Sequence, residues 1–189
     1  MNPMRLFILG ALDARGEMHG HQLRLQAEEE RIHLWADVTV GGLYGAIKRL
    51  ANEGLIREVR TEREGNYPER QVYAITEEGR TALGVQRDEG LRSIVFRPDP
   101  FDLAVTRLDP DGLDRMGPAL ELRILGLERL LAEQEAMLVR AAPHLSIAET
   151  WVMHHRADRI RAEIASHRTL LSLVPEIIDD ELARKADPQ

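Results

Sequence analysis

Thr39-Val-Gly-Gly-Leu-Tyr-Gly-Ala-Ile-Lys-Arg-Leu-Ala-Asn-Glu-Gly-Leu55 is the stretch that decides the fold. Leu43, Ile47 and Leu50 recur at i, i+4 and i+7, which is the spacing of one face of a helix. Thr39 is placed to cap the start of this helix, and Gly54 stands where a helix commonly ends in a left-handed residue. We therefore predict a short amphipathic helix whose two ends are both marked in the sequence.

The opposite face of this helix is nearly bare. Gly41, Gly45, Lys48 and Asn52 follow one another along it, and each glycine costs about 1 kcal/mol of helix stability relative to alanine. A helix without side chains near its start can lie very close to a grooved surface, and the DNA major groove admits one helix and attracts positive charge. This face predicts a recognition helix; the alternative is an ordinary surface helix that tolerates a few glycines.

The composition limits the classes of protein to consider. The chain has 189 residues, 4% of them aromatic and none of them cysteine, so one domain or two small ones are expected, without disulfides or thiolate zinc sites. The formal net charge of −7 argues against non-specific coating of nucleic acid but allows a local basic face. The apolar residues 6–12 are too few to span a membrane and show no signal-peptide pattern. We expect a cytoplasmic protein.

Two helices precede the glycine-bearing helix, and a hairpin follows it. Apolar residues predict helices over residues 4–14 and 21–31, and three successive helices with a bare face on the third are the order of a helix-turn-helix unit. After Gly54 the pattern becomes that of two strands, which form a wing. Arg63 and Arg70 at its tip are placed to reach the DNA backbone or minor groove; the alternative is a solvated turn, because neighbouring glutamates dilute the charge.

A domain boundary is expected near the middle of the chain. Thr76 caps a helix that runs through Val95, and the Arg-Pro-Asp-Pro sequence of residues 97–100 ends it. We therefore divide the chain into a domain of residues 1–96 and a domain of residues 97–189.

The sequence of the second domain predicts helices only. Apolar stripes indicate a short helix containing Phe101 and Leu108 and a long one over residues 113–138, in which Gly117-Pro118 introduces a kink or delays the start. Ser146 and Glu149 form a capping box for a last helix that Pro175 ends. Its apolar stripe is Ile147, Trp151, His154, Ala157, Ile160, Ile164, His167, Leu171 and Val174. Two long antiparallel helices leave more apolar surface than they can bury, so a homodimer is expected.

Several short segments of the first half recur in the order and spacing of a known family. They are Leu9-Gly10, Met18-His19-Gly20-His21-Gln22-Leu23, Gly42-Leu43-Tyr44, Ile47-Lys48-Arg49-Leu50, Glu53-Gly54-Leu55-Ile56 and the wing with the following turn, residues 64–80. On these segments, which span nearly all of residues 4–83, the chain resembles the PadR family of winged helix-turn-helix transcriptional regulators. The resemblance implies that Tyr44, Lys48 and Arg49 contact operator DNA from the recognition helix and Arg70 from the wing.

The fold class expected is mainly α with a small β-hairpin: an N-terminal winged helix-turn-helix and a C-terminal antiparallel helical dimerisation region. The expected DNA-binding residues are Thr39, Gly41, Gly42, Tyr44, Gly45, Lys48, Arg49, Arg63 and Arg70. Tyr67 stands where this family often has arginine, which weakens the charge of the wing.

Two tryptophans suggest an effector pocket. Trp151 and His155, at i and i+4, are placed to line a pocket beside Trp35 at a dimer interface, and the resemblance implies release from DNA by small aromatic or hydrophobic compounds. The alternative is plain packing of a large aromatic side chain. Structural roles are expected for His154 and His167, and the sequence carries no catalytic motif, metal site or cofactor-binding loop.

The sequence therefore predicts a homodimeric, sequence-specific DNA-binding regulator, a repressor that occupies an inverted repeat and is released by a small molecule. The alternative is a protein–protein adaptor that keeps the fold and has lost DNA binding, in keeping with the acidic balance and Tyr67.

Overall fold

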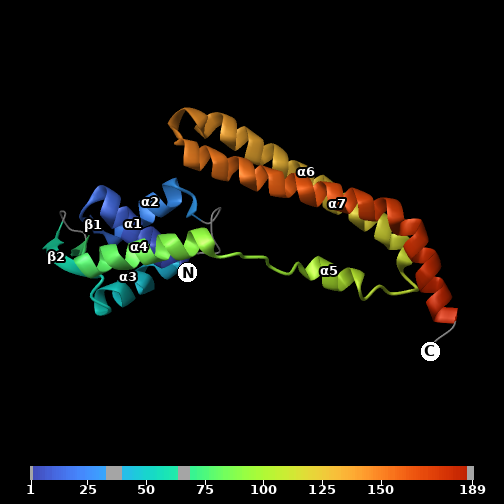
Figure 1. The fold of residues 1–189 in the computed structure, drawn as a ribbon, viewed down its shortest axis with the longest axis horizontal. Helices are drawn as coiled ribbons and strands as arrows, with labels where there is room; N and C mark the ends of the chain where they lie inside the picture. The colour runs from blue at the N-terminus through green and yellow to red at the C-terminus, as the bar shows by residue number, and fades with distance from the viewer. Residues whose placement is uncertain (1, 33–39, 64–68, 187–189) are drawn as a thin grey trace. The chain divides into compact units, whose positions relative to one another are not determined.

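The computed structural model describes residues 2–32, 40–63 and 69–186, and it divides into two compact units, Met1–Phe96 and Arg97–Gln189 (Figure 1). The chain is mostly helical, with one small antiparallel sheet in the N-terminal unit. This confirms the predicted fold class. Within the described residues, no helix is long and apolar enough to cross a membrane.

The N-terminal unit is built from helices and a three-stranded sheet. In chain order its elements are α1 (Pro3–Arg15), β1 (Met18–His19), α2 (Gly20–Glu29), the 3₁₀ turn η2 (Val40–Gly42), α3 (Leu43–Asn52), β2 (Ile56–Glu62), β3 (Arg70–Ile75) and α4 (Glu77–Arg92). The strands lie in the order β1-β3-β2, and β1 pairs antiparallel with β3, Met18 opposite Tyr73 and His19 opposite Val72. The prediction of a two-stranded hairpin was therefore incomplete, because a strand of two residues is too short to leave a periodic pattern in the sequence.

The core of this unit sits between the helices and the sheet. Its most deeply buried members are Ile8, Leu9, Leu12, Leu23, Leu43, Ile56, Leu83 and Val72. Two predicted helix ends are confirmed: Gly54 follows α3 with a φ of +72°, and the Thr76 side chain accepts a hydrogen bond from the backbone N–H of Gly79. The helix predicted to run through Val95 instead ends at Arg92, and Ile94 beyond it is 97% exposed, so no packing of its side chain extends the helix.

The C-terminal unit is a helical hairpin with a short helix before it. Its elements are α5 (Pro100–Val105), the 3₁₀ turn η3 (Leu113–Arg115), α6 (Met116–Ala141), the 3₁₀ turn η4 (Ala142–His144) and α7 (Ile147–Ala186). Ion pairs between the long helices, Glu128 with Arg168 and Glu135 with Arg161, show their antiparallel register. Pro118 lies in the first turn of α6, where its missing N–H costs nothing. Of the two effects predicted for Gly117-Pro118, a kink or a delayed start, the structure shows the delayed start, because α6 begins at Met116.

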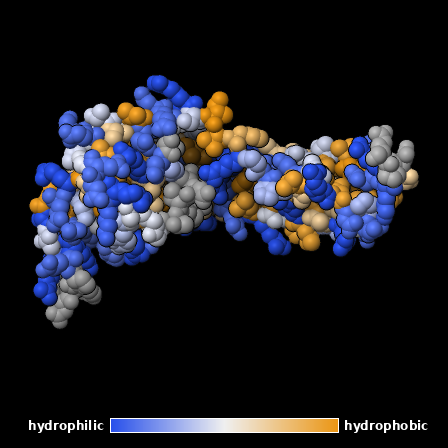
Figure 2. Space-filling model, turned by 90° about the horizontal axis from the view of Figure 1, so that it is seen from below, coloured by the Kyte–Doolittle hydropathy of each residue, from blue (hydrophilic) through white to orange (hydrophobic). Residues whose placement is uncertain are grey.

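Two expectations for α7 were wrong. The helix continues through Pro175 to Ala186, because Ile177 and Ile178 beyond the proline pack on the α6 residues Met116 and Leu120, and this packing offsets the lost hydrogen bond. The first residues of the predicted apolar stripe of α7 were also wrong, because they lie on a different side of the helix from the buried row. Ile147, Trp151 and His154 are exposed, whereas the buried row is Met153, Ala157, Ile160, Ile164, His167 and Val174. Figure 2 shows further apolar side chains at the surface of the molecule among hydrophilic ones.

Candidate nucleic-acid interface

Helix α3 separates its apolar and polar residues as the sequence predicts. Leu43, Ala46, Ile47 and Leu50 are buried in the core, whereas Tyr44, Gly45, Lys48 and Arg49 are exposed. Gly41 and Gly42 form the preceding turn η2, and Gly42 begins the helix without a side-chain cap. Thr39, predicted as the cap, lies outside the described residues. The exposed side of α3 therefore begins with backbone alone and continues with one phenol and two cations.

The start of α2 packs closely against α3. A Cβ atom added at Gly20 would lie 2.8 Å from Cε1 of Tyr44 and 3.4 Å from the side chain of Ile47. Only glycine leaves room for this contact, which positions the Tyr44 ring against α2. Gly20 belongs to one of the segments shared with the family, but its packing against Tyr44 leaves no pattern in the sequence.

His19 fixes the start of α2. Its Nδ1 accepts a hydrogen bond of 3.1 Å from the backbone N–H of Gln22, and its own N–H donates to the Gln22 side-chain oxygen at 2.9 Å. This reciprocal pair is a capping box in which histidine replaces serine or threonine. Burial lowers the pKa of His19, and the positive charge of Arg70 lowers it further. His19 is therefore held in the neutral form, whose Nδ1 can accept the bond.

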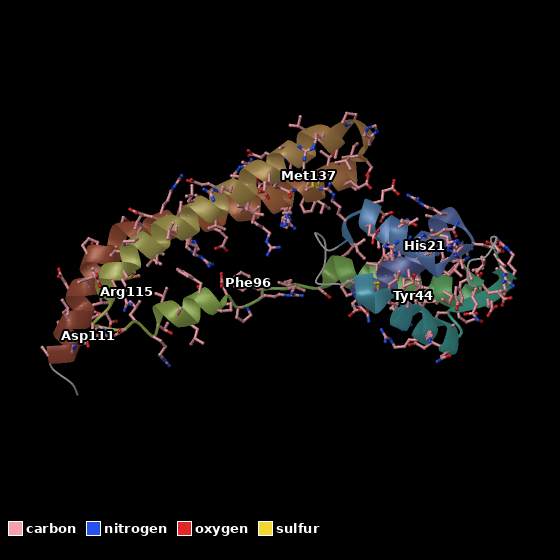
Figure 3. All side chains as sticks on the ribbon, turned by 180° about the vertical axis from the view of Figure 1, so that it is seen from behind. His21, Tyr44, Phe96, Asp111, Arg115 and Met137 are labelled. Atoms are coloured by element: carbon pink, nitrogen blue, oxygen red, sulfur yellow. The ribbon has the colours of Figure 1, made fainter. Side chains whose placement is uncertain are left out.

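Three elements meet at a hollow of about 330 Å³ on this side of the unit. The start of α2 contributes His21, α3 contributes Tyr44 and Lys48, and β3 contributes Arg70 and Gln71. Figure 3 shows His21 and Tyr44 on their neighbouring helices. The structure thus brings together three of the predicted DNA-binding residues, Tyr44, Lys48 and Arg70.

His21 and Gln71 are neighbours of these residues that were not predicted from the sequence. Glu69 and Tyr73 also line the hollow, and the Tyr73 hydroxyl donates a hydrogen bond of 2.7 Å to Gln71. Burial raises the pKa of Tyr73, so its hydroxyl stays protonated and keeps this bond. These residues come together because β1 pairs with β3, which places the start of α2, directly after β1, next to the wing strand β3.

The cations of this surface differ in how far acidic residues neutralise them. Arg60 on β2 donates to Glu62 at 2.7 Å and to Glu17. Lys48 and Arg49, in contrast, form no ion pair with any residue that the structure describes. Arg63 is exposed just after β2. The positive charge available to a nucleic acid is therefore concentrated on α3 and at the outer end of the wing.

Two residues of the predicted effector pocket, Trp151 and His155, lie side by side on α7. Trp151 is 64% exposed, and its ring lies 5.0 Å from that of His155. Trp35 lies outside the described residues, so the pocket stays a prediction. Among the residues described, no three histidine, aspartate or glutamate side chains gather as metal ligands would.

Comparison with known proteins gives one family and several solved structures. Residues 8–85 match the model of the transcriptional regulator PadR-like family. The structure is similar to that of Bacillus subtilis PadR in complex with operator DNA, with a TM-score of 0.68, 20% identity and coverage of 92% of this chain and 98% of that one. The same Bacillus protein in complex with p-coumaric acid gives a TM-score of 0.69, 18% identity and coverage of 92% and 99%.

A third similar structure is smu.1604c from Streptococcus mutans, with a TM-score of 0.63, 18% identity and coverage of 89% and 98%. No curated protein matches the chain in sequence. At these identities the structural likeness shows the fold alone.

Proposed function

We propose that this chain, whose residues 8–85 belong to the PadR-like family of transcriptional regulators, acts as a homodimeric repressor that binds an inverted-repeat operator. The observation that carries the proposal is the exposed side of α3, where Tyr44 and Lys48 border the same hollow as Arg70 of the wing strand. A helix and a wing that present cations from one side of a small unit are suited to the major groove and the flanking backbone.

The glycines at the start of α3 support a close approach to DNA. Gly41 and Gly42 are exposed, and a Cβ atom at Gly41 would meet nothing within 4 Å in the free protein. The missing side chain of Gly41 therefore serves no packing purpose within the described residues. In the proposed complex these residues and Gly45 let the helix start lie against the groove, while Lys48 and Arg49 contact phosphates or guanine edges. Arg63 and Arg70 contact the backbone from the wing.

The proposed dimer rests on the C-terminal unit. Helix α6 buries one row of side chains against α7, yet Leu122 is 70% exposed and Leu125 and Leu130 are also exposed. An apolar row left open on a long helix is suited to a second copy. Two-fold symmetry would present two recognition helices, which explains the choice of an inverted repeat.

The Bacillus subtilis protein supports this proposal, because it was crystallised with operator DNA and with p-coumaric acid. By analogy, we infer that a small molecule releases this chain from its operator.

Fluorescence anisotropy in a salt series tests DNA binding. The probe is a duplex selected from random DNA, or one from the upstream region of the protein's own gene, and a scrambled duplex is the control. Affinity for the native duplex should fall steeply between 50 and 200 mM salt, by about 10³-fold or more if six or more phosphates are contacted.

Lys48→Ala should weaken binding and reduce the slope of log affinity against log salt by about one unit. Lys185→Ala, which removes the same charge from the C-terminal unit, is the matched control and should leave the slope unchanged. A protein that binds no selected duplex, or binds with no salt dependence, would be an adaptor rather than a regulator.

A further inference from the structure

An apolar cleft of about 350 Å³ lies within the C-terminal unit, between α5 and the start of α6. Its walls are largely aliphatic and include Ala104, Val105, Leu108, Leu113, Met116 and Ala119. The volume falls within the range of small-molecule sites, roughly 300–1,000 Å³.

Helix α5 and the turn after it border this cleft and pack only in part against their own unit. Phe101, Ala104, Val105 and Leu108 follow the i, i+3, i+4, i+7 spacing of a core-facing helix, yet no residue of α5 is buried. Phe101 and Leu108 pack against the cluster around Met116, and the Phe101 ring lies 4.6 Å from that of His167. Ala104 and Val105 of α5 therefore line the cleft with apolar surface that is not buried.

One wall of the cleft carries a fixed, half-buried cation, Arg123. Its Nη2 donates to Asp99 at 2.6 Å, its Nε donates to His167 at 2.7 Å, and the guanidinium lies 4.3 Å from the centre of the Phe101 ring. His167 accepts this bond at Nε2, so its Nδ1 carries the hydrogen and donates it in a hydrogen bond of 2.7 Å to the Glu163 carbonyl oxygen. These contacts hold the guanidinium in one place.

The guanidinium keeps one nitrogen for a ligand. Nη1 of Arg123 has no hydrogen-bond partner among the residues described, and a planar guanidinium is the group that proteins favour for carboxylates. The rim of the cleft adds Arg115, whose Nη2 lies 3.8 Å from the Asp109 carboxylate that also borders it. Figure 3 labels Arg115 close to the start of α6. The cleft thus offers aliphatic walls beside one guanidinium nitrogen, Nη1 of Arg123, that has no partner among the described residues.

We propose that this cleft binds a small apolar monocarboxylic acid, with its chain against α5 and its carboxylate on Arg123. A carboxylate on Nη1 shares the guanidinium with Asp99, which is bound at Nη2, and so weakens the Arg123–Asp99 ion pair. Asp99 also caps α5, because its side chain accepts the backbone N–H of Phe101 at 2.9 Å. Binding therefore changes how the start of α5 is held, directly after residues 93–99, which join the two units. This regulatory consequence rests on the proposed function, whereas the binding itself does not.

Calorimetric titration with octanoate and 2-naphthoate tests the site on the full chain. Ala104→Trp fills the cleft, and Leu103→Trp is the matched control, because Leu103 is the neighbouring residue of α5, is 63% exposed and does not line the cleft. We expect at least one acid to bind the wild type and Leu103→Trp equally and Ala104→Trp at least tenfold more weakly. The amide of that acid should bind at least tenfold more weakly than the acid.

Three results would overturn the proposal: no binding of either acid, binding that Ala104→Trp leaves unchanged, or equal binding of acid and amide. If neither acid binds and Ala104→Trp alone converts a dimer to a monomer in sedimentation, a second copy of the chain occupies the cleft instead. Anisotropy with the selected duplex on the same samples separates the two proposals. DNA binding without acid binding refutes only the cleft, and acid binding without DNA binding refutes the proposed function.

Discussion

Gly79 and Gly84 lie five residues apart in α4, and the structure predicts opposite effects when each is changed to alanine. A Cβ atom at Gly79 would lie 2.0 Å from the carbonyl oxygen of Leu55 and 2.7 Å from Cγ1 of Ile75. A Cβ atom at Gly84 would meet nothing within 4 Å. The chemistry of the two substitutions is identical, so only their surroundings distinguish them.

The cost at Gly79 follows from what the new methyl group meets. The Leu55 oxygen belongs to the backbone and accepts the Thr76 N–H at 3.1 Å, so it cannot rotate away. Overpacking of a core costs about 1–3 kcal/mol, and weakening this hydrogen bond adds about 1 kcal/mol. The higher helix propensity of alanine returns at most about 1 kcal/mol. We expect a net loss of about 2 kcal/mol for Gly79→Ala and a gain of about 0.5–1 kcal/mol for Gly84→Ala.

Urea unfolding of the full chain, followed by far-UV circular dichroism, measures this difference. At a slope of about 1–3 kcal/mol per molar urea, the midpoints of the two variants should differ by about 1 M or more, with the slope unchanged. Gly79→Ala should shift the transition of the N-terminal unit downwards, and Gly84→Ala should shift it upwards. Equal shifts in one direction would show that the close approach of α4 to Leu55 does not govern stability.

Two further predictions concern the start of α2. Gly20→Ala places a methyl group against the Tyr44 ring and should weaken DNA binding, measured by anisotropy, by about tenfold, or ~1.4 kcal/mol. Gly10→Ala in α1 is the control and should leave the affinity unchanged, because a Cβ there meets nothing within 4 Å. Equal affinities of the two variants would contradict the role of Gly20. The lowered pKa of His19 means that the unfolded chain binds the proton more readily, so stability is lost as the pH falls below the unfolded value of about 6.5. Thermal unfolding between pH 7.5 and 5 should therefore show a larger loss for the wild type than for His19→Asn, which keeps a capping oxygen without titrating, and parallel losses would refute this role.

Local signals in the sequence were enough to predict most of the elements, and non-local ones were not. Helix α3 was predictable because its apolar spacing and the glycine after its end lie within one short stretch. The end of α7 was not, because Pro175 is a strong local stop signal whose effect is offset by Ile177 and Ile178 packing on another helix. The phase of the α7 stripe failed similarly, since Trp151 and Met153 are both apolar and only α6 decides which is buried.

The candidate interface shows the same limit at the level of single residues. Lys48 and Arg49 could be identified from the sequence, because a helical face is a property of one segment. Arg70 and His21 border the same hollow as Lys48 because β1 pairs with β3. This pairing consists of two pairs of residues, each more than fifty positions apart in the chain. A strand of two residues gains its stability from the sheet it joins, not from its own sequence. The DNA-facing surface proposed here is therefore held by the least predictable element of the unit, so disrupting the Met18–Tyr73 pairing should affect DNA binding more than its small contribution to the core suggests.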